Sequence, residues 1–426
     1  SIKDDETRVA LVEAGLLQEL MLERSRERSR VGNIYQGKVL RVMPGMQAAF
    51  VDIGLERAGF IHASDISAID AHGYELRDST PRAIAELVRE GQTLIVQVLK
   101  DEISGKGVRL SNHLTLPARN LVLLPRSLHQ GVSQRIADAS ERERLLALLG
   151  ECLAEIEWDL AKGVILRTAA QGATKAELIE DLGHLRRLWI KLQERLGRPS
   201  GIRCIYSEEP IFLRAVRDFL HAGVSRIRVD SGEAFEALTQ FLADYMPNSR
   251  VALELDGEEG ELFARSSAGQ MSLQDQIAAA LETQVKLGNG GDLVIEQTES
   301  MVTIDVNTGS FVGAVGARGQ ASTILETNLQ AAAEIARQLR VRNLGGIVVI
   351  DFIDMESESH RQQVRQALLT ALARDSARTA VGEFSQFGLL EMTRKRTRES
   401  LQRILRSRCD ACLGSGLVDS AQRRGA

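Results

Sequence analysis

The chain has 426 residues, of which 44% are hydrophobic and 26% charged, which excludes a mostly disordered protein and allows about two to four domains. No apolar run reaches the roughly 18 residues that a membrane-spanning helix needs, and the charged N-terminus, SIKDDE, does not resemble a secretory signal. The 53 Lys and Arg residues against 58 Asp and Glu residues give a net charge of −5, so any nucleic-acid site must be a local basic patch.

Short strands separated by turns dominate the first 115 residues. Alternating apolar residues predict strands within residues 7–22, followed by a solvated charged turn at 23–30. Further strands are expected at residues 34–35, 38–42, 48–53, 59–62, 93–99 and 108–110. Strands this short at this spacing are typical of a small barrel.

From residue 116 onward, helices and strands alternate. Helices are expected at residues 139–149, 175–196, 210–221, 233–245, 272–286, 322–342 and 359–373. Strands are expected at residues 163–168, 226–229, 250–255, 292–297, 300–306 and 346–351. This order predicts an α/β protein with more than one domain.

Two of the expected strands end in carboxylates. Asp305 is followed closely by Asn307, and Asp351 ends an apolar strand of the kind that lies buried in a sheet. In α/β folds, ligands bind beyond such strand ends. Carboxylate and amide oxygens suit Mg²⁺, which can activate water and stabilise charge on a phosphodiester. The spacing alone also fits two helix caps or turn formers.

Three arginines lie at the end of the expected helix 322–342. Arg337, Arg340 and Arg342 precede the pair of glycines that stops the helix. Cations near a helix C-terminus are stabilised by the helix dipole. The cluster therefore fits either a structural role or phosphate binding.

Several stretches of the sequence resemble the bacterial ribonuclease E/G family. The catalytic segment of the family resembles TIDVNTG at residues 303–309 and ETNLQAAAEIARQLRVRNLGGIVVIDFIDM at residues 326–355. Its S1-type RNA-binding domain resembles NIYQG at residues 33–37 and QAAFVDIGL at residues 47–55. Its basic run before the zinc element resembles FGLLEMTRKRTR at residues 387–398. The resemblance covers nearly the whole chain in order, and Thr308-Gly309 and the short length are closer to the G branch.

The resemblance implies an α/β multidomain fold in which an S1-type OB barrel is inserted in an RNase H-like domain. A 5′-phosphate sensor subdomain, a DNase I-like catalytic domain and a zinc-link would follow. The expected boundaries are 1–32 and 207–270 for the RNase H-like domain, 33–115 for the barrel, 116–206 for the sensor, 271–395 for the catalytic domain, 396–416 for the zinc-link and 417–426 for a tail. The family's further C-terminal small domain is expected to be missing from this sequence.

The resemblance also implies roles for individual residues. Asp305 and Asp351 would bind catalytic Mg²⁺, and Asn307 would orient the site. Phe50 and Phe60 would stack on RNA bases and Lys106 would contact a phosphate; the residues alone leave open whether each Phe belongs to the barrel core.

The 5′-phosphate sensor is implied by a second group of residues. Arg167 and Thr168 match the family's contacts to a 5′-monophosphate, Arg378 matches a further phosphate contact, and Val122 matches an apolar contact to the terminal nucleotide. Ala118 stands where the E branch has glycine, which leaves the sensor's backbone contact open.

Cys409 and Cys412 form a C-x-x-C pair, the one close pair among four cysteines, so a secreted disulfide framework is disfavoured and a cytoplasmic location is expected. Structural Zn²⁺ needs four ligands, so the pair is an empty half site, a redox motif or half of a site shared by two chains. The resemblance implies the shared site, and with it a homodimer. Asp410 replaces the family's proline.

The sequence therefore predicts an Mg²⁺-dependent endoribonuclease that hydrolyses single-stranded, AU-rich RNA and leaves 5′-phosphate products. Stimulation by a 5′-monophosphate and roles in rRNA maturation and mRNA decay follow from the resemblance, and no membrane anchor is expected. The alternatives are a non-catalytic RNA-binding factor, in which the aspartate pair is structural, and a DNA-directed metal nuclease.

Overall fold

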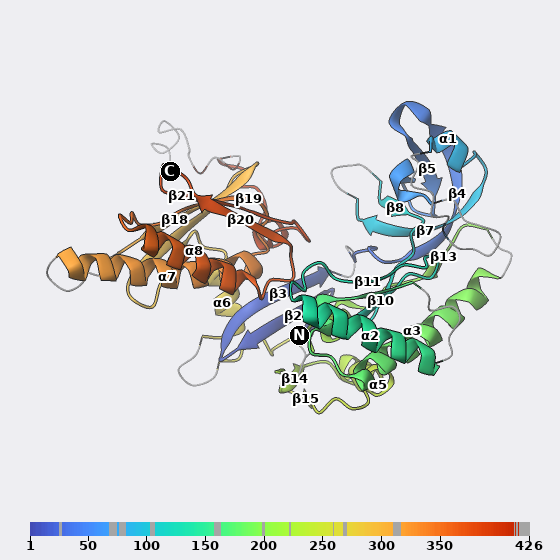
Figure 1. The fold of residues 1–426 in the computed structure, drawn as a ribbon, viewed down its shortest axis with the longest axis horizontal. Helices are drawn as coiled ribbons and strands as arrows, with labels where there is room; N and C mark the ends of the chain where they lie inside the picture. Colours follow the sequence, from blue (N-terminus) through green and yellow to red (C-terminus); the bar gives the residue numbers. More distant parts are fainter. Residues whose placement is uncertain are drawn as a thin grey trace. The chain divides into compact units, whose positions relative to one another are not determined.

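The chain folds into two compact units (Figure 1). Unit 1 contains Ser1–Thr7 and Leu22–Gly260, and unit 2 contains Arg8–Met21 and Glu261–Ala426. The structure, a computed structural model, describes residues 1–24, 28–67, 75, 82–102, 107–156, 163–197, 201–220, 223–258, 260–266, 271–309, 317–412, 414 and 416. Within these ranges, no helix combines the length and the apolar character needed to cross a membrane.

A small β-barrel forms one part of unit 1. Its strands are β4 (Ile34–Met43), β5 (Ala48–Asp52), β6 (Gly59–His62), β7 (Thr93–Lys100) and β8 (Arg109–Ser111), with α1 (Ile84–Leu87) between β6 and β7. They pair in the order β4-β5-β6-β8-β7, and β4 also pairs with β7, which closes the barrel. Alternate residues such as Val39, Val51 and Ile61 are fully buried inside it. The predicted barrel is confirmed, and β13 (Arg203–Tyr206) extends its sheet beside β4.

A small sheet covered by two long helices follows the barrel. The sheet contains β9 (Leu116–Pro117), β10 (Leu121–Leu123), β11 (Gln130–Val132) and β12 (Val164–Leu166), in the order β11-β12-β10-β9. The helices α2 (Ala139–Ile156) and α3 (Lys175–Leu196) bury a leucine-rich core. A capping box between Thr174 and Glu177 starts α3 at the predicted residue.

The last part of unit 1 alternates helices and strands. It contains α4 (Ile211–Phe219), β14 (Arg226–Val229), α5 (Gly232–Tyr245) and β15 (Ala252–Leu255), and β14 and β15 are parallel. Asp230 accepts hydrogen bonds from the backbone N–H groups of Ile2 (3.0 Å) and Gly260 (3.1 Å). The N-terminus of the chain is thereby joined to a segment more than 220 residues later.

The N-terminal strands β1 (Ile2–Lys3), β2 (Glu6–Glu13) and β3 (Leu16–Arg24) form a separate three-stranded sheet. The charged stretch 23–30, predicted as a solvated turn, begins within β3, and its residues 25–27 lie outside the described residues; Arg28 is exposed, but the stretch also makes specific contacts. Glu23 pairs with Arg214 at 2.8 Å, and the Arg28 guanidinium donates to the Glu208 carbonyl at 2.8 Å. Asp101 accepts from the Ser29 hydroxyl (2.7 Å). These charges therefore attach the segment to the rest of unit 1.

A six-stranded sheet forms the centre of unit 2. Its strands are β16 (Gln284–Lys286), β17 (Asp292–Gln297), β18 (Met301–Asn307), β19 (Gly346–Asp351), β20 (Thr379–Phe384) and β21 (Leu389–Arg394), in the order β16-β17-β18-β19-β21-β20. The strands β18 and β19 are parallel, and the other pairs are antiparallel. Two helices, α7 (Ala317–Val341) and α8 (Glu358–Leu372), run side by side along the sheet (Figure 1).

The buried face of this sheet packs against α7 and α8. Ile304, Ile350 and Leu390 from neighbouring strands form one core with Leu339 and Leu368 from the helices. A smaller core joins β3 to α6 (Leu273–Ala279) and α9 (Leu401–Leu405). The opposite face of the sheet, here called the open face, carries exposed side chains such as Ile347, which is 49% exposed.

The predicted helix 272–286 is wrong in its second half. The helix α6 ends at Ala279, and residues 284–286 instead form the edge strand β16. Val285 is the antiparallel partner of Leu293 and packs against the sheet's core. Hairpin pairing with β17 thus overrides the helical apolar pattern. The strands β20 and β21 were not predicted.

Candidate active site

Two exposed aspartates lie on adjacent strands of unit 2. Asp305 in β18 and Asp351 at the end of β19 are direct partners in the parallel register, on strands about 4.8 Å apart. Both project from the open face, because Ile304, Val306 and Ile350 beside them are buried against the helices. The two carboxylates therefore face solvent from one region of the sheet.

The carboxylates influence one another electrostatically. Partial burial, together with the negative charges of Asp305 and Asp354, raises the pKa of Asp351 above its ordinary value. The Asn307 amide donates to Asp305 Oδ2 at 2.9 Å and so orients that carboxylate. The sequence pattern had not assigned Asp354 a role.

The donor set fits a hard divalent cation that keeps several water ligands. Two carboxylates and the free amide oxygen of Asn307 are oxygen donors, which Mg²⁺ prefers. Within the described ranges of the chain, no group of three or more His, Cys, Asp or Glu side chains is arranged to hold a metal. A site built from two aspartates thus leaves most of the coordination sphere for water and substrate.

A buried amide in α7 fixes the segment that follows Asp351. The Asn328 side chain, which is 0% exposed, donates to the Ile353 carbonyl (2.8 Å) and accepts from the Ile353 backbone N–H (3.1 Å). Ile353 lies between Asp351 and Asp354, so this clamp ties both carboxylates to the helix. No sequence pattern pointed to Asn328, because an asparagine within an amphipathic helix has no distinctive spacing.

A glycine-rich turn fixes the end of β18. The adjacent residue of α7, Thr327, accepts a hydrogen bond from Asn289 in the turn before β17 (2.8 Å). A Cβ at Gly291 would lie 2.7 Å from the Asn307 carbonyl, and one at Gly309, whose φ is +58°, would meet the Gly290 carbonyl. Glycine is needed at both positions because two stretches of backbone cross there.

The barrel in unit 1 presents a row of aromatic and cationic residues. Phe50 and Phe60 are cross-strand partners, half-buried on the outer side of the sheet, and their rings are 6.1 Å apart in an edge-to-face arrangement. Arg41 is the partner of Phe50 on one side, Arg109 the partner of Phe60 on the other, and Lys100 the partner of Arg109.

This row has the composition of a single-strand binding surface. Arg109 is engaged by Asp65 at 2.8 Å, while Arg41 and Lys100 are exposed. The sequence had not singled out Arg41 and Lys100, because their positions beside the two rings depend on strand pairing. Lys106, predicted to contact phosphate, lies outside the described residues.

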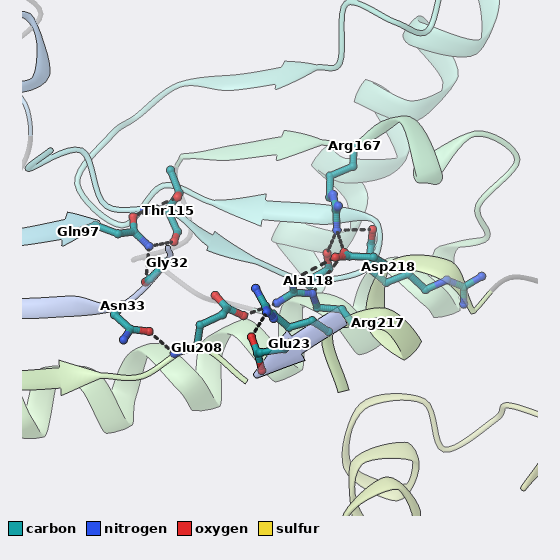
Figure 2. Close-up of polar contacts among 12 residues, drawn as sticks. Glu23, Gly32, Asn33, Gln97, Thr115, Ala118, Arg167, Glu208, Arg217 and Asp218 are labelled. Atoms are coloured by element: carbon teal, nitrogen blue, oxygen red, sulfur yellow. Dashed lines mark hydrogen bonds and ion pairs between the residues drawn. The ribbon is translucent and has the colours of Figure 1, made fainter. Parts of the chain in front are cut away.

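Arg167 follows β12 and is held by neighbouring groups (Figure 2). Its Nη1 donates to the carbonyls of Ala118 (2.6 Å) and Arg119 (3.3 Å) and pairs with Asp218 (2.8 Å). Burial opposes ionisation of Asp218, but Arg217 and Arg167 outweigh it and keep the pKa of that carboxyl below its ordinary value. All three bonds use Nη1, so the rest of the guanidinium has no partner among the described residues.

The other predicted sensor residues do not share the contacts that hold Arg167. The Thr168 hydroxyl lies 3.1 Å from that of Ser133, and Val122 is half-buried in β10 opposite Ile165, two residues before Arg167. The backbone N–H of Ala118 donates to the Leu121 carbonyl (2.8 Å). Arg378 is exposed and belongs to unit 2, so its place in the same pocket stays a prediction.

The three arginines at the end of α7 are bonded within unit 2. Arg337 donates to the Leu17 carbonyl (2.8 Å), Arg340 to Gln18 (3.0 Å) and Arg342 to Gln338 (2.6 Å). The arginines of the basic run at 394–398, which begins at the end of β21, also bond to groups within unit 2. Arg394 and Asp375 form a buried ion pair at 2.6 Å, Arg396 donates to the Gly345 carbonyl and Arg398 pairs with Glu19. These contacts favour the structural interpretation of both clusters.

The C-x-x-C pair lies near the C-terminal end of the described residues. Cys409 is exposed and Cys412 partly exposed, and both are free thiols. Backbone N–H groups of Gly416 and Gly414, and the Cys409 side chain, lower the pKa of the Cys412 thiol. Donors of this kind stabilise a thiolate, the form that binds Zn²⁺. The pair thus fits two of the four ligands of a zinc site.

Comparisons with known proteins show extensive similarity along the chain. The family model described as Ribonuclease E/G family matches residues 115–397, and the S1 RNA binding domain model matches residues 28–112. Ribonuclease G of Escherichia coli (strain K12) is 47% identical over 424 residues, covering 99% of this chain and 84% of that protein. Ribonuclease G of Haemophilus influenzae is 45% identical with the same coverage. Ribonuclease E of a Nostoc species is 37% identical, covering 91% of this chain and 54% of that protein.

The clamp made by Asn328 can be tested by mutation. Asn328→Ala would remove the partner of both the N–H and the C=O of Ile353 and leave a cavity at a fully buried position, so the free energy of unfolding should fall by about 2–5 kcal/mol. Urea denaturation measures this loss, with Gln363→Ala, an exposed amide on α8, as the matched control. An unchanged unfolding midpoint for Asn328→Ala would contradict the clamp.

Proposed function

Because the chain belongs to the ribonuclease E/G family, we propose that it is an Mg²⁺-dependent endoribonuclease that hydrolyses phosphodiesters in single-stranded RNA. The observation that carries the proposal is the pair of exposed aspartates, Asp305 and Asp351, in register on adjacent parallel strands. A second observation, the S1-type barrel with its row of rings and cations, supports RNA as the substrate.

The residues at the two strand ends have defined tasks in this mechanism. Asp305 and Asp351 would hold the cation, and Asn307 would keep the Asp305 carboxylate turned toward it. When bound, Mg²⁺ would lower the pKa of water and stabilise negative charge on the phosphodiester. The Asn328 clamp would preserve the position of Asp351 while RNA binds and leaves.

The barrel would bind the RNA strand. Stacking of bases on Phe50 and Phe60 is tolerant of sequence, and Arg41, Lys100 and Lys106 would attract phosphates. This arrangement favours single-stranded RNA, because bases in a duplex are already stacked. The expected preference for AU-rich RNA agrees with single-strand binding, because AU-rich segments unpair most easily.

The proposal includes recognition of the RNA 5′ end. Arg167, whose Nη2 and Nε are not used by the bonds that hold it, would bind a 5′-monophosphate together with Thr168 and Arg378. Val122 would contact the terminal nucleotide. Products with 5′-phosphate ends would then be good substrates for a second cut, which suits rRNA maturation and mRNA decay in the cytoplasm.

The first test compares wild type with Asp305→Asn on a short AU-rich RNA that carries a 5′-monophosphate. Cleavage should require Mg²⁺ and should fall at least about 100-fold in the variant, because the cation loses a charged ligand. RNA binding, measured by fluorescence anisotropy, should persist. Glu296→Gln, an exposed carboxylate change on β17 on the same face of the sheet, should leave the rate unchanged.

Two other outcomes would change the assignment. Tight RNA binding by wild type without any Mg²⁺-dependent cleavage would favour the non-catalytic RNA-binding factor. Equal cleavage of the matching 2′-deoxy strand would favour a DNA-directed nuclease.

The sensor predicts a dependence on the 5′ end. Wild type should cleave 5′-monophosphate RNA roughly 10- to 100-fold faster in kcat/KM than 5′-hydroxyl RNA, as charge-assisted hydrogen bonds allow. Arg167→Gln should bring the ratio of the two rates close to one. Arg186→Gln, an exposed arginine change on α3, is the control and should keep the ratio. A ratio of one for wild type would refute the sensor.

We also propose that Cys409 and Cys412 bind Zn²⁺ together with the same pair from a second chain, which makes the protein a homodimer. Light scattering should show a dimer with one zinc ion per two chains, and Cys409→Ser should yield monomers. Cys204→Ser, a change of another exposed cysteine, should remain dimeric. A zinc-free dimer, or a dimeric Cys409→Ser, would exclude the shared site.

A further inference from the structure

Phe387 is the most exposed large apolar side chain that the structure describes. Its side chain is 79% exposed, whereas Phe384, three residues earlier, packs 5.9 Å from Phe352 in the core of unit 2. Aromatic residues make up 4% of the chain. Because rings are scarce in this chain, an exposed one is a candidate for a functional contact, and its location indicates which contact.

The ring is carried by a well-bonded turn between β20 and β21. The backbone N–H of Ser385 donates to the Leu389 carbonyl (2.8 Å), and that of Gly388 donates to the Ser385 carbonyl (3.0 Å). The Ser385 hydroxyl accepts from the N–H groups of Phe387 (3.3 Å) and Leu389 (3.2 Å). Gly388 has a φ of +79°, which glycine adopts without strain. The backbone that presents Phe387 is thus held in one conformation.

This turn lies at the end of the sheet that carries the carboxylates. Leu389, two residues after Phe387, is the antiparallel partner of Asp351. A Cβ at Gly388 would lie 3.5 Å from Asp354 Oδ1, so the turn approaches the second carboxylate as well. Phe387 is therefore adjacent to the place where the scissile phosphate must sit.

We propose that Phe387 is a substrate-positioning residue whose ring stacks on a base of the RNA next to the bond that is cut. This inference rests on the proposed endoribonuclease function. The proposed cation would attract the scissile phosphate itself, but Asp354 adds a negative charge beside it, and attraction between charges does not fix the bases on either side of the cut. A neutral aromatic face can do so, because every base stacks on it and no charge is needed.

Removal of the ring should weaken cleavage by a predictable amount. Phe387→Ala should lower kcat/KM about 5- to 140-fold, which converts to roughly 1–3 kcal/mol of base stacking, mainly through a higher KM. Phe387→Trp should retain or exceed wild-type kcat/KM, and Phe387→Leu should behave like Phe387→Ala. Met271→Ala, a change at another side chain more than half exposed in unit 2, should have no effect.

An abasic scan identifies the stacked nucleotide and separates stacking from a folding defect. One base at a time is removed from the RNA around the cleavage site, and each substrate is assayed with wild type and with Phe387→Ala. At one position, loss of the base should slow wild type by the same factor as Phe387→Ala and should not slow the variant further. A uniform loss at all positions, or no loss, would overturn the proposal.

A binding assay distinguishes failure of this inference from failure of the proposed function. 2-Aminopurine placed at the identified position, or at each position in turn, should be quenched on binding to Asp305→Asn, and Phe387→Ala in that background should abolish the quenching. Quenching without cleavage by wild type would refute hydrolysis but retain the RNA contact. If Phe387→Ala instead turns dimers into monomers and leaves quenching intact, the ring belongs to a protein interface and the proposal is wrong.

Discussion

The arrangement of the active-site region depends on one buried amide in the middle of a helix. Asparagine is unfavourable in a helix interior, yet Asn328 is completely buried in α7. Its side chain pairs with both the backbone N–H and the C=O of Ile353, which leave the sheet at that point and need hydrogen-bond partners. The clamp joins the segment that follows Asp351 to α7, and the parallel register places Asp305 beside Asp351.

Positive charge is divided between structural and binding roles. The arginines of α7 and of the run at 394–398 bond to carbonyls, amides and carboxylates within unit 2. Arg41 and Lys100 remain exposed beside the rings of the barrel. A chain with a net charge of −5 can therefore still attract RNA locally. The sequence alone does not indicate this, because a cluster of cations in the sequence does not show which of them stay exposed in the fold.

The sequence predicted those parts of the fold that depend on local pattern. The helix α3 was predicted to the residue because its apolar period and capping box agree, and the strands that carry Asp305 and Asp351 were predicted from their apolar residues. The family resemblance is confirmed over nearly the whole chain. Asn328, the edge strand β16 and the exposure of Phe387 were not predictable, because each depends on how the folded chain pairs and packs and not on a periodic pattern.

A nuclease that relies on carboxylates must hold a polyanion at its most negative point. Cationic side chains placed there would compete with the metal ion for the carboxylates, so further binding energy has to come from elsewhere on the strand and be used to place the scissile bond. In the proposed function, the barrel would provide cations and stacking rings for one part of the RNA. Phe387 provides an uncharged contact at the cut itself, held by a turn that is hydrogen-bonded on both sides. Charge and stacking thus act on different parts of the same substrate.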